Sequence, residues 1–188
     1  MAFDQRARDE LVLAGDPRVR AIAASVTTLG GIVGATAVAA GSVAWLAWRR
    51  RYLDAATLVA VVLGCAAMEL VMKPLFAVVQ PRPIDPAIPW GAFAFPSGHA
   101  LRAFGLYGCL ATLVVSGGPR APWRWAIATV LVSVAGLVAW SRVCLDVHWT
   151  TDAVGGALAA TTWVVVCMVA RRYAKDRNRA QTERGAPR

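Results

Sequence analysis

Long stretches without charge are the feature that most constrains this 188-residue chain. Residues 21–48 form a run of 28 uncharged positions, more than the roughly 20 that a helix needs to cross a bilayer. Further apolar stretches occupy residues 55–72 (broken by Glu69), 103–118, 125–141 and 153–170. Charged residues make up only 16% of the chain, against about 25% in soluble domains. We therefore expect an all-α integral membrane protein, a bundle of about five transmembrane helices.

The charged residues divide the chain into three parts. Residues 1–20 hold eight charged positions and no apolar core of the length that a signal peptide requires. We expect this segment to be a polar N-terminal arm or an interfacial helix. Residues 21–170 would form the transmembrane domain. Residues 171–188 carry seven basic and two acidic side chains and are predicted to be a disordered basic tail.

The net charge of +9 is distributed unevenly along the chain. Five spans would place the N-terminus and the loops around residues 73–102 and 142–152 on one side of the membrane. The other side would hold 12 of the 20 basic residues, so the positive-inside rule makes it cytoplasmic. A basic chain could also bind nucleic acid, but that needs a basic stripe on a soluble fold. We therefore expect a bilayer and no nucleic acid as a partner.

A smaller polar set faces the opposite, extracytoplasmic side. Single basic residues near helix ends usually extend to the lipid headgroups. Convergence of charge from three segments near membrane depth instead indicates a functional site. The set consists of Lys73, Arg82, His99, Arg102, Arg142, His148 and Asp152.

Two short patterns within this set suggest phosphate chemistry. His148 and Asp152 are four residues apart, so they share a face if a helix begins near His148. A carboxylate beside an imidazole orients it and supports its positive charge, as in activated nucleophiles and bases. The sequence Pro96-Ser97-Gly98-His99 can begin a helix, and the free N–H groups there bind anions. An ordinary helix cap is the alternative for this second pattern.

Together these residues resemble the signature of the phosphatidic acid phosphatase type 2 superfamily. That signature is a lysine followed by Arg-Pro, then Pro-Ser-Gly-His, then Ser-Arg-x5-His-x3-Asp. Residues 96–99 match the second part, and Ser141, Arg142, His148 and Asp152 match the third. In the first part, eight residues instead of the usual six separate Lys73 from Arg82-Pro83. At the usual spacing Gln80 would take the position of the arginine, and Arg102 could substitute for it.

The resemblance implies hydrolysis of a lipid phosphate or diphosphate through a phosphohistidine. His148 would be the nucleophile, Asp152 its orienting partner and His99 the general acid and base. The resemblance assigns the phosphate-binding roles to Lys73, Arg82, Ser97, Gly98 and Arg142. It implies neither a metal nor another cofactor, and the four cysteines lack metal-ligand spacing.

The substrate and the catalytic competence stay open. A polyprenyl phosphate or diphosphate, phosphatidic acid and phosphatidylglycerol phosphate all fit a site at the membrane surface. A vanadium haloperoxidase would have a similar anion pocket, but five spans argue against a soluble enzyme. The other alternative is a catalytically inactive protein that binds or transports lipid phosphates. Glu69, one turn before Lys73, is expected to be the ion-pair partner of that lysine.

Overall fold

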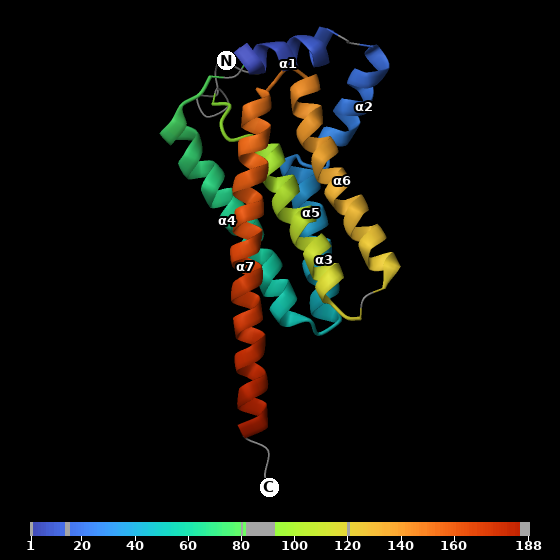
Figure 1. The fold of residues 1–188 in the computed structure, drawn as a ribbon, viewed down its shortest axis with the longest axis vertical. Helices are drawn as coiled ribbons and strands as arrows, with labels where there is room; N and C mark the ends of the chain where they lie inside the picture. Colours follow the sequence, from blue (N-terminus) through green and yellow to red (C-terminus); the bar gives the residue numbers. More distant parts are fainter. Residues whose placement is uncertain (1, 14–15, 80, 82–92, 120, 185–188) are drawn as a thin grey trace.

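The structure, a computed structural model, describes all residues except 1, 14–15, 80, 82–92, 120 and 185–188. Its described part is all-helical apart from one isolated antiparallel bridge between Val79 and Phe93. The helices, in chain order, are α1 (Ala2–Leu13), α2 (Pro17–Thr27), α3 (Ile32–Trp48), α4 (Tyr52–Phe76), α5 (Gly98–Ser116), α6 (Pro122–Cys144) and α7 (Thr150–Arg184). Figure 1 shows α3 to α7 running roughly along one long axis, with the N-terminus and C-terminus at opposite ends.

Four of these helices, α4 to α7, are each long and apolar enough to cross a membrane. A fifth span is possible only if α2 and α3 are counted together, because a 46° bend separates them. The expected bundle of about five spans is therefore confirmed, with its first span broken at residues 28–31. Gly30 and Gly31 lie at the break, where glycine weakens a helix by roughly 1 kcal/mol relative to alanine.

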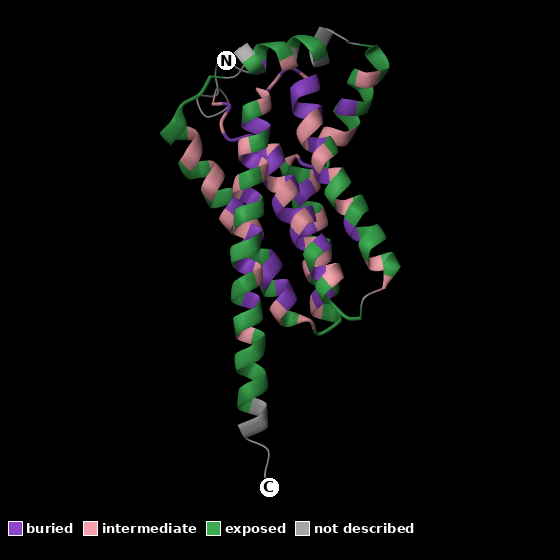
Figure 2. Cartoon of the chain, viewed as in Figure 1, coloured by how far each residue is buried: buried purple, intermediate pink, exposed green. Residues whose placement is uncertain are grey.

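Helix α5 occupies the centre of the bundle and packs against α4, α6 and α7. Leu101, Leu106 and Cys109 on this helix are fully or almost fully buried. The outer helices instead expose large apolar side chains such as Leu63 and Val130, which suits helices surrounded by lipid. Figure 2 shows the same pattern, with buried residues gathered along the interior of the bundle and exposed ones on its outside.

Helix α1 lies across one end of the bundle (Figure 1) and contacts α6 and α7. The carboxylate of Asp4 accepts hydrogen bonds from the backbone N–H and the hydroxyl of Thr151, at 3.0 and 3.1 Å. Asp4 is buried by this contact. The contact attaches the N-terminal helix to the first turn of α7, immediately beside Asp152.

Helix α7 differs from the sequence-based expectation because it continues through Arg184. Most of the segment that was predicted to be a disordered tail is thus helical. The reason is local, since Arg, Ala, Lys and Gln are strong helix formers. With 35 residues, α7 is about 52 Å long, so it extends well past a hydrocarbon core of about 30 Å.

An ion-pair cluster ties α7 to α4 at the end of the bundle opposite α1. Asp54 Oδ1 accepts a hydrogen bond from Arg171 Nε at 2.5 Å, and Asp54 Oδ2 accepts one from Arg51 Nε at 2.6 Å. Both Asp54 and Arg171 are buried. A buried charge is tolerated in this position because it is paired.

Candidate active site

The site begins where the chain enters α5. Ser97 is extended and α5 starts at Gly98 without a side-chain cap, so the first N–H groups of the helix have no partner within the helix. The backbone N–H of Ser97 donates to the carbonyl of Asp152 at 3.1 Å, which joins this turn to α7. The hydroxyl of Ser97 is fully buried, yet it has no hydrogen-bond partner among the described residues. An anion at the helix start would supply that partner.

Gly98 is required for close packing at this turn. A Cβ at this position would lie 2.0 Å from Glu69 Oε1 on α4, far inside van der Waals contact. The predicted role of Gly98 was phosphate binding. The structure adds that its missing side chain makes room for the carboxylate of Glu69.

His148 and Asp152 come together as their spacing predicted. His148 lies in the loop between α6 and α7, and Asp152 lies in the first turn of α7. Nδ1 of His148 is 3.5 Å from Asp152 Oδ2. At that separation Nδ1 forms no hydrogen bond with any described residue, while Asp152 Oδ2 accepts one from the Trp149 N–H at 2.8 Å. The carboxylate is therefore held in place, with the imidazole at the outer limit of hydrogen bonding.

His148 is almost completely buried, and this governs its protonation. Burial lowers the pKa of His148 from its ordinary value, because an apolar surrounding disfavours the charged imidazolium. The charge of Arg142 lowers the pKa of His148 further, whereas the carboxylate of Asp152 opposes the shift. The lowered pKa favours the neutral imidazole, the form of histidine that can act as a nucleophile or base.

Arg142 reaches the site from the last turn of α6. Its Nη1 donates to the hydroxyl of Thr27 at 3.0 Å, and its buried Nε has no hydrogen-bond partner within the described part of the chain. Thr27 is the last residue of α2, so the break in the first span brings it here. Sequence reasoning did not identify Thr27, which lies in an uncharged stretch, and only the glycine pair after it signals a break.

A second charged network centres on Glu69 of α4. Its Oε1 pairs with Lys73 Nζ at 3.0 Å, as the sequence predicted. Its Oε2 pairs with Nη1 of Arg102 on α5, which was not foreseen. Arg102 also donates from Nε to the carbonyl of Gly30 at 3.0 Å, and its Nη2 lies 3.5 Å from His99 Nδ1. The predicted accessory residue Arg102 therefore contacts the predicted general acid directly.

The two networks meet around His99. Its imidazole interacts electrostatically with Lys73, Arg102, Arg142 and His148. Three cations from three helices and a second imidazole thus act electrostatically on His99. Such an arrangement suits a multiply charged anion whose charge shifts during reaction.

Arg82, the remaining predicted phosphate ligand, and Gln80 lie outside the described residues. Within the described ranges, no group of three or more His, Cys, Asp and Glu residues could hold a metal ion. The four cysteines are buried and unpaired.

Comparison with known proteins identifies the family of the chain. A sequence model of the PAP2 superfamily matches residues 54–176. Phosphatidylglycerophosphatase B of Bacillus subtilis (strain 168) is 33% identical over 90 residues, which are 47% of this chain and 44% of that protein. The match thus spans less than half the length of this curated relative.

Two solved structures share the fold. The first is a transmembrane PAP2-type phosphatidylglycerolphosphate phosphatase from Bacillus subtilis, with a TM-score of 0.75 and 22% identity, covering 92% of this chain and 86% of that one. The second is Aquifex aeolicus LpxE, with a TM-score of 0.69 and 20% identity, covering 89% of this chain and 96% of that one. The helical bundle described above is therefore shared with both of these proteins, the first of which is a transmembrane phosphatase.

Proposed function

We propose that this chain, which belongs to the PAP2 superfamily, is a membrane-embedded lipid phosphate phosphatase that acts through a phosphohistidine. One observation carries the proposal most strongly. Next to the buried His148–Asp152 pair, Ser97 Oγ and Arg142 Nε are both buried without a hydrogen-bond partner in the described residues. Leaving such groups unsatisfied costs about 1–3 kcal/mol each, and a bound phosphate would remove that cost.

The first half-reaction forms a bond between His148 and phosphorus. Nδ1 of His148 faces Asp152, which leaves Nε2 to attack. The bond between phosphorus and the leaving oxygen breaks, and His99 donates a proton to that oxygen. The negative charge of Asp152 stabilises the imidazolium-like state of His148 as its nitrogen becomes bonded to phosphorus.

The second half-reaction returns the enzyme to its starting state. His99 accepts a proton from a water molecule, which attacks phosphorus and breaks the bond to His148. Ser97, Arg142, Lys73 and the start of α5 hold the equatorial oxygens in both halves, with Arg82 as a further proposed ligand. Because these donors are in place before the reaction, they stabilise the developing charge without reorganisation. We propose that neither step uses a metal ion.

The substrate proposed is a lipid phosphate of the bilayer. The site lies at one end of a bundle whose outer surface is apolar, so a headgroup can enter while its acyl or prenyl chain stays in lipid. The comparison proteins that act on phosphatidylglycerol phosphate make that lipid the first choice. Phosphatidic acid and polyprenyl phosphates or diphosphates complete the set to be tested.

Phosphate release from this panel by the purified protein tests the proposal. His148→Ala should lower turnover by about 10⁴-fold or more, since it removes the nucleophile. The control is Thr161→Ala, because Thr161 is exposed and its hydroxyl donates to the carbonyl of Ala157 in the same helix. Incubation of the wild-type protein with radioactive substrate should leave an acid-labile label on the protein, which would identify the phosphohistidine. Turnover by His148→Ala would contradict the proposal that His148 is the nucleophile. Binding of the lipids without any release of phosphate would instead identify an inactive binding protein.

A further inference from the structure

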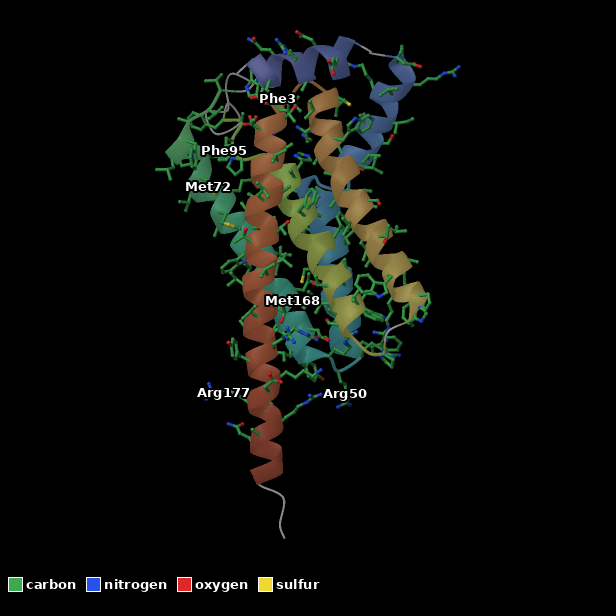
Figure 3. The ribbon with its side chains drawn as sticks, viewed as in Figure 1. Phe3, Arg50, Met72, Phe95, Met168 and Arg177 are labelled. Carbon is green, nitrogen blue, oxygen red and sulfur yellow. The ribbon has the colours of Figure 1, made fainter. Side chains whose placement is uncertain are left out.

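A groove at the other end of the bundle is not used by the proposed reaction. It lies between α5, α6 and α7 and has a volume of about 790 Å³, within the range of roughly 300–1,000 Å³ for small-molecule sites. Ala111, Trp125, Ala128, Val132 and Val164 are among its apolar lining residues. Met168, also in the lining, lies midway along α7 in Figure 3.

The open end of the groove is basic. Arg172, Lys175 and Arg179 line it from the extension of α7, and their spacing of three and four residues places them on one helix face. Like charges at such spacing repel each other, and none of the three forms an ion pair with another described residue. Asp176 offsets one of these charges. Arg171 also lines the groove, but its charge is paired with Asp54. Arg172, Lys175 and Arg179 against Asp176 therefore leave the open end with a positive excess.

The dimensions of the groove match one leaflet of a bilayer. The 16 residues from Val164 to Arg179 span about 22 Å of helix, and half of a bilayer with its headgroup layer is about 20–22 Å thick. With the cations of α7 at headgroup level, the apolar lining would lie in the hydrocarbon region of that leaflet. Trp125, which is 56% exposed at the groove, is of the residue type that occupies the membrane interface.

We propose that this groove binds one anionic glycerophospholipid from the leaflet at the α7 end, with its acyl chain between α6 and α7. Its phosphate would lie among Arg172, Lys175 and Arg179. Charge complementarity selects an anionic headgroup, and the apolar floor on α5 selects a lipid instead of a soluble anion. This site is separate from the phosphate site, which lies at the opposite end of α5.

The test measures lipid-dependent thermal stability of the full chain in detergent, because a ligand that binds only the folded state raises Tm. Phosphatidylglycerol should raise Tm, whereas phosphatidylcholine and inorganic phosphate should not. Each cation near an anionic lipid is worth about a fivefold change in affinity. The triple variant Arg172→Gln/Lys175→Gln/Arg179→Gln should therefore bind phosphatidylglycerol roughly 100-fold more weakly.

A charge-matched control separates a site from general attraction. Arg49→Gln/Arg50→Gln/Arg177→Gln removes three exposed cations at the same end but outside the groove lining; Figure 3 shows Arg50 and Arg177 there. This control should keep the Tm shift. Equal losses in the two triple variants would overturn the proposal, as would a shift of equal size with phosphatidylcholine or inorganic phosphate.

Two further variants test the place of binding. Val132→Trp puts a large side chain into the groove at a half-exposed position and should abolish the shift with all charges intact. Arg142→Gln impairs the phosphate site and should leave the shift unchanged, since the groove does not include it. A full shift in Val132→Trp, or its loss in Arg142→Gln, would place the lipid elsewhere. Each shift is measured against the Tm of that variant without lipid, so the result does not depend on catalysis.

Discussion

At the scale of single residues, the site consists of buried groups whose protonation and orientation are set by their neighbours. Burial lowers the pKa of His148, and His99 lies beside Arg102, which is ion-paired with Glu69. The pairing of His148 with Asp152 could be predicted from the sequence, because their spacing is distinctive. The residues that hold them in place could not. Thr27 and Gly30 contact Arg142 and Arg102 because of a bend in the first span that no periodicity in the sequence indicates. Glu69 pairs with Arg102, which lies 33 positions away in the sequence.

The lowered pKa of His148 predicts sensitivity to acid. The unfolded chain takes up a proton near the ordinary histidine pKa of about 6.5, whereas the folded chain takes it up only at lower pH. As pH falls below about 6.5, the unfolded state therefore binds more protons and the free energy of unfolding decreases. Between pH 7 and 5.5, wild type should lose more Tm than His148→Gln. Equal losses would show that His148 does not titrate as proposed.

Glu69→Gln should impair catalysis through its neighbours. Removing the carboxylate leaves Lys73 and Arg102 without their ion-pair partner and releases Arg102 from its place beside His99. We expect kcat to fall about tenfold or more, and the pH dependence of kcat to move as His99 meets a freed guanidinium. Glu69→Asp should recover part of the activity. An unchanged pH profile in Glu69→Gln would limit Glu69 to a structural role.

Gly98 and Gly108 offer a matched comparison on one helix. Gly98→Ala places a methyl group 2.0 Å from Glu69 Oε1, while a Cβ at Gly108 meets nothing within 4 Å. We expect Gly98→Ala to lose most phosphate release, because the carboxylate must move and take Arg102 with it. Gly108→Ala should keep full activity and gain up to about 1 kcal/mol of stability. Similar behaviour of the two variants would contradict the close packing of Gly98 against Glu69.

At the scale of helices, contacts between elements distant in sequence position the site. Helix α5 supplies Gly98 and His99, and α7 supplies Asp152. Helix α1 stabilises the first turn of α7 through Asp4. The five spans could be predicted from hydropathy, but the helical extension of α7 and the break in the first span could not. Composition alone does not distinguish a solvated helix from a disordered basic segment, and two glycines in a long apolar run do not reveal a 46° bend.

The docking of α1 can be tested at Asp4. Asp4→Ala removes the acceptor for two groups of Thr151 and should cost about 1 kcal/mol, as loss of a helix cap does. Because Thr151 precedes Asp152, activity should fall as well. Asp9→Ala is the control, since Asp9 is exposed on the same helix. Thermal unfolding and phosphate release report the two effects. If Asp4→Ala keeps both its stability and its phosphate release, α1 does not support the site.

At the scale of the whole molecule, the two ends of the bundle have different roles. One end carries the two histidines with Lys73, Arg102 and Arg142, and the other carries the Asp54 cluster and the basic extension of α7. Figure 1 shows these ends separated by the length of the bundle. We propose that the basic end is cytoplasmic and that the active site faces the extracytoplasmic side. Intact cells that carry the protein should release phosphate from a lipid phosphate confined to the outer leaflet. That result would support this orientation.

The Asp54 cluster should affect stability without affecting chemistry. Asp54→Ala leaves the buried Arg171 unpaired, and breaking a buried ion pair in this way costs about 3–5 kcal/mol. Replacing both partners, as in Asp54→Leu/Arg171→Met, should restore much of that loss. Turnover per folded molecule should stay near wild type in both, because the cluster lies at the far end. A drop in kcat in the double variant would reveal coupling between the ends.

The break in the first span also bears on how the protein is assembled. The carbonyls of Leu29 and Gly30 are satisfied by Tyr107 and Arg102, both on α5. A nascent chain emerges N-terminus first, so these carbonyls are made more than 70 residues before the donors that satisfy them. Irregular backbone is tolerated at membrane depth only where protein or water covers it. The first span therefore cannot reach its final state during its own insertion, and arrival of α5 completes both the span and the site.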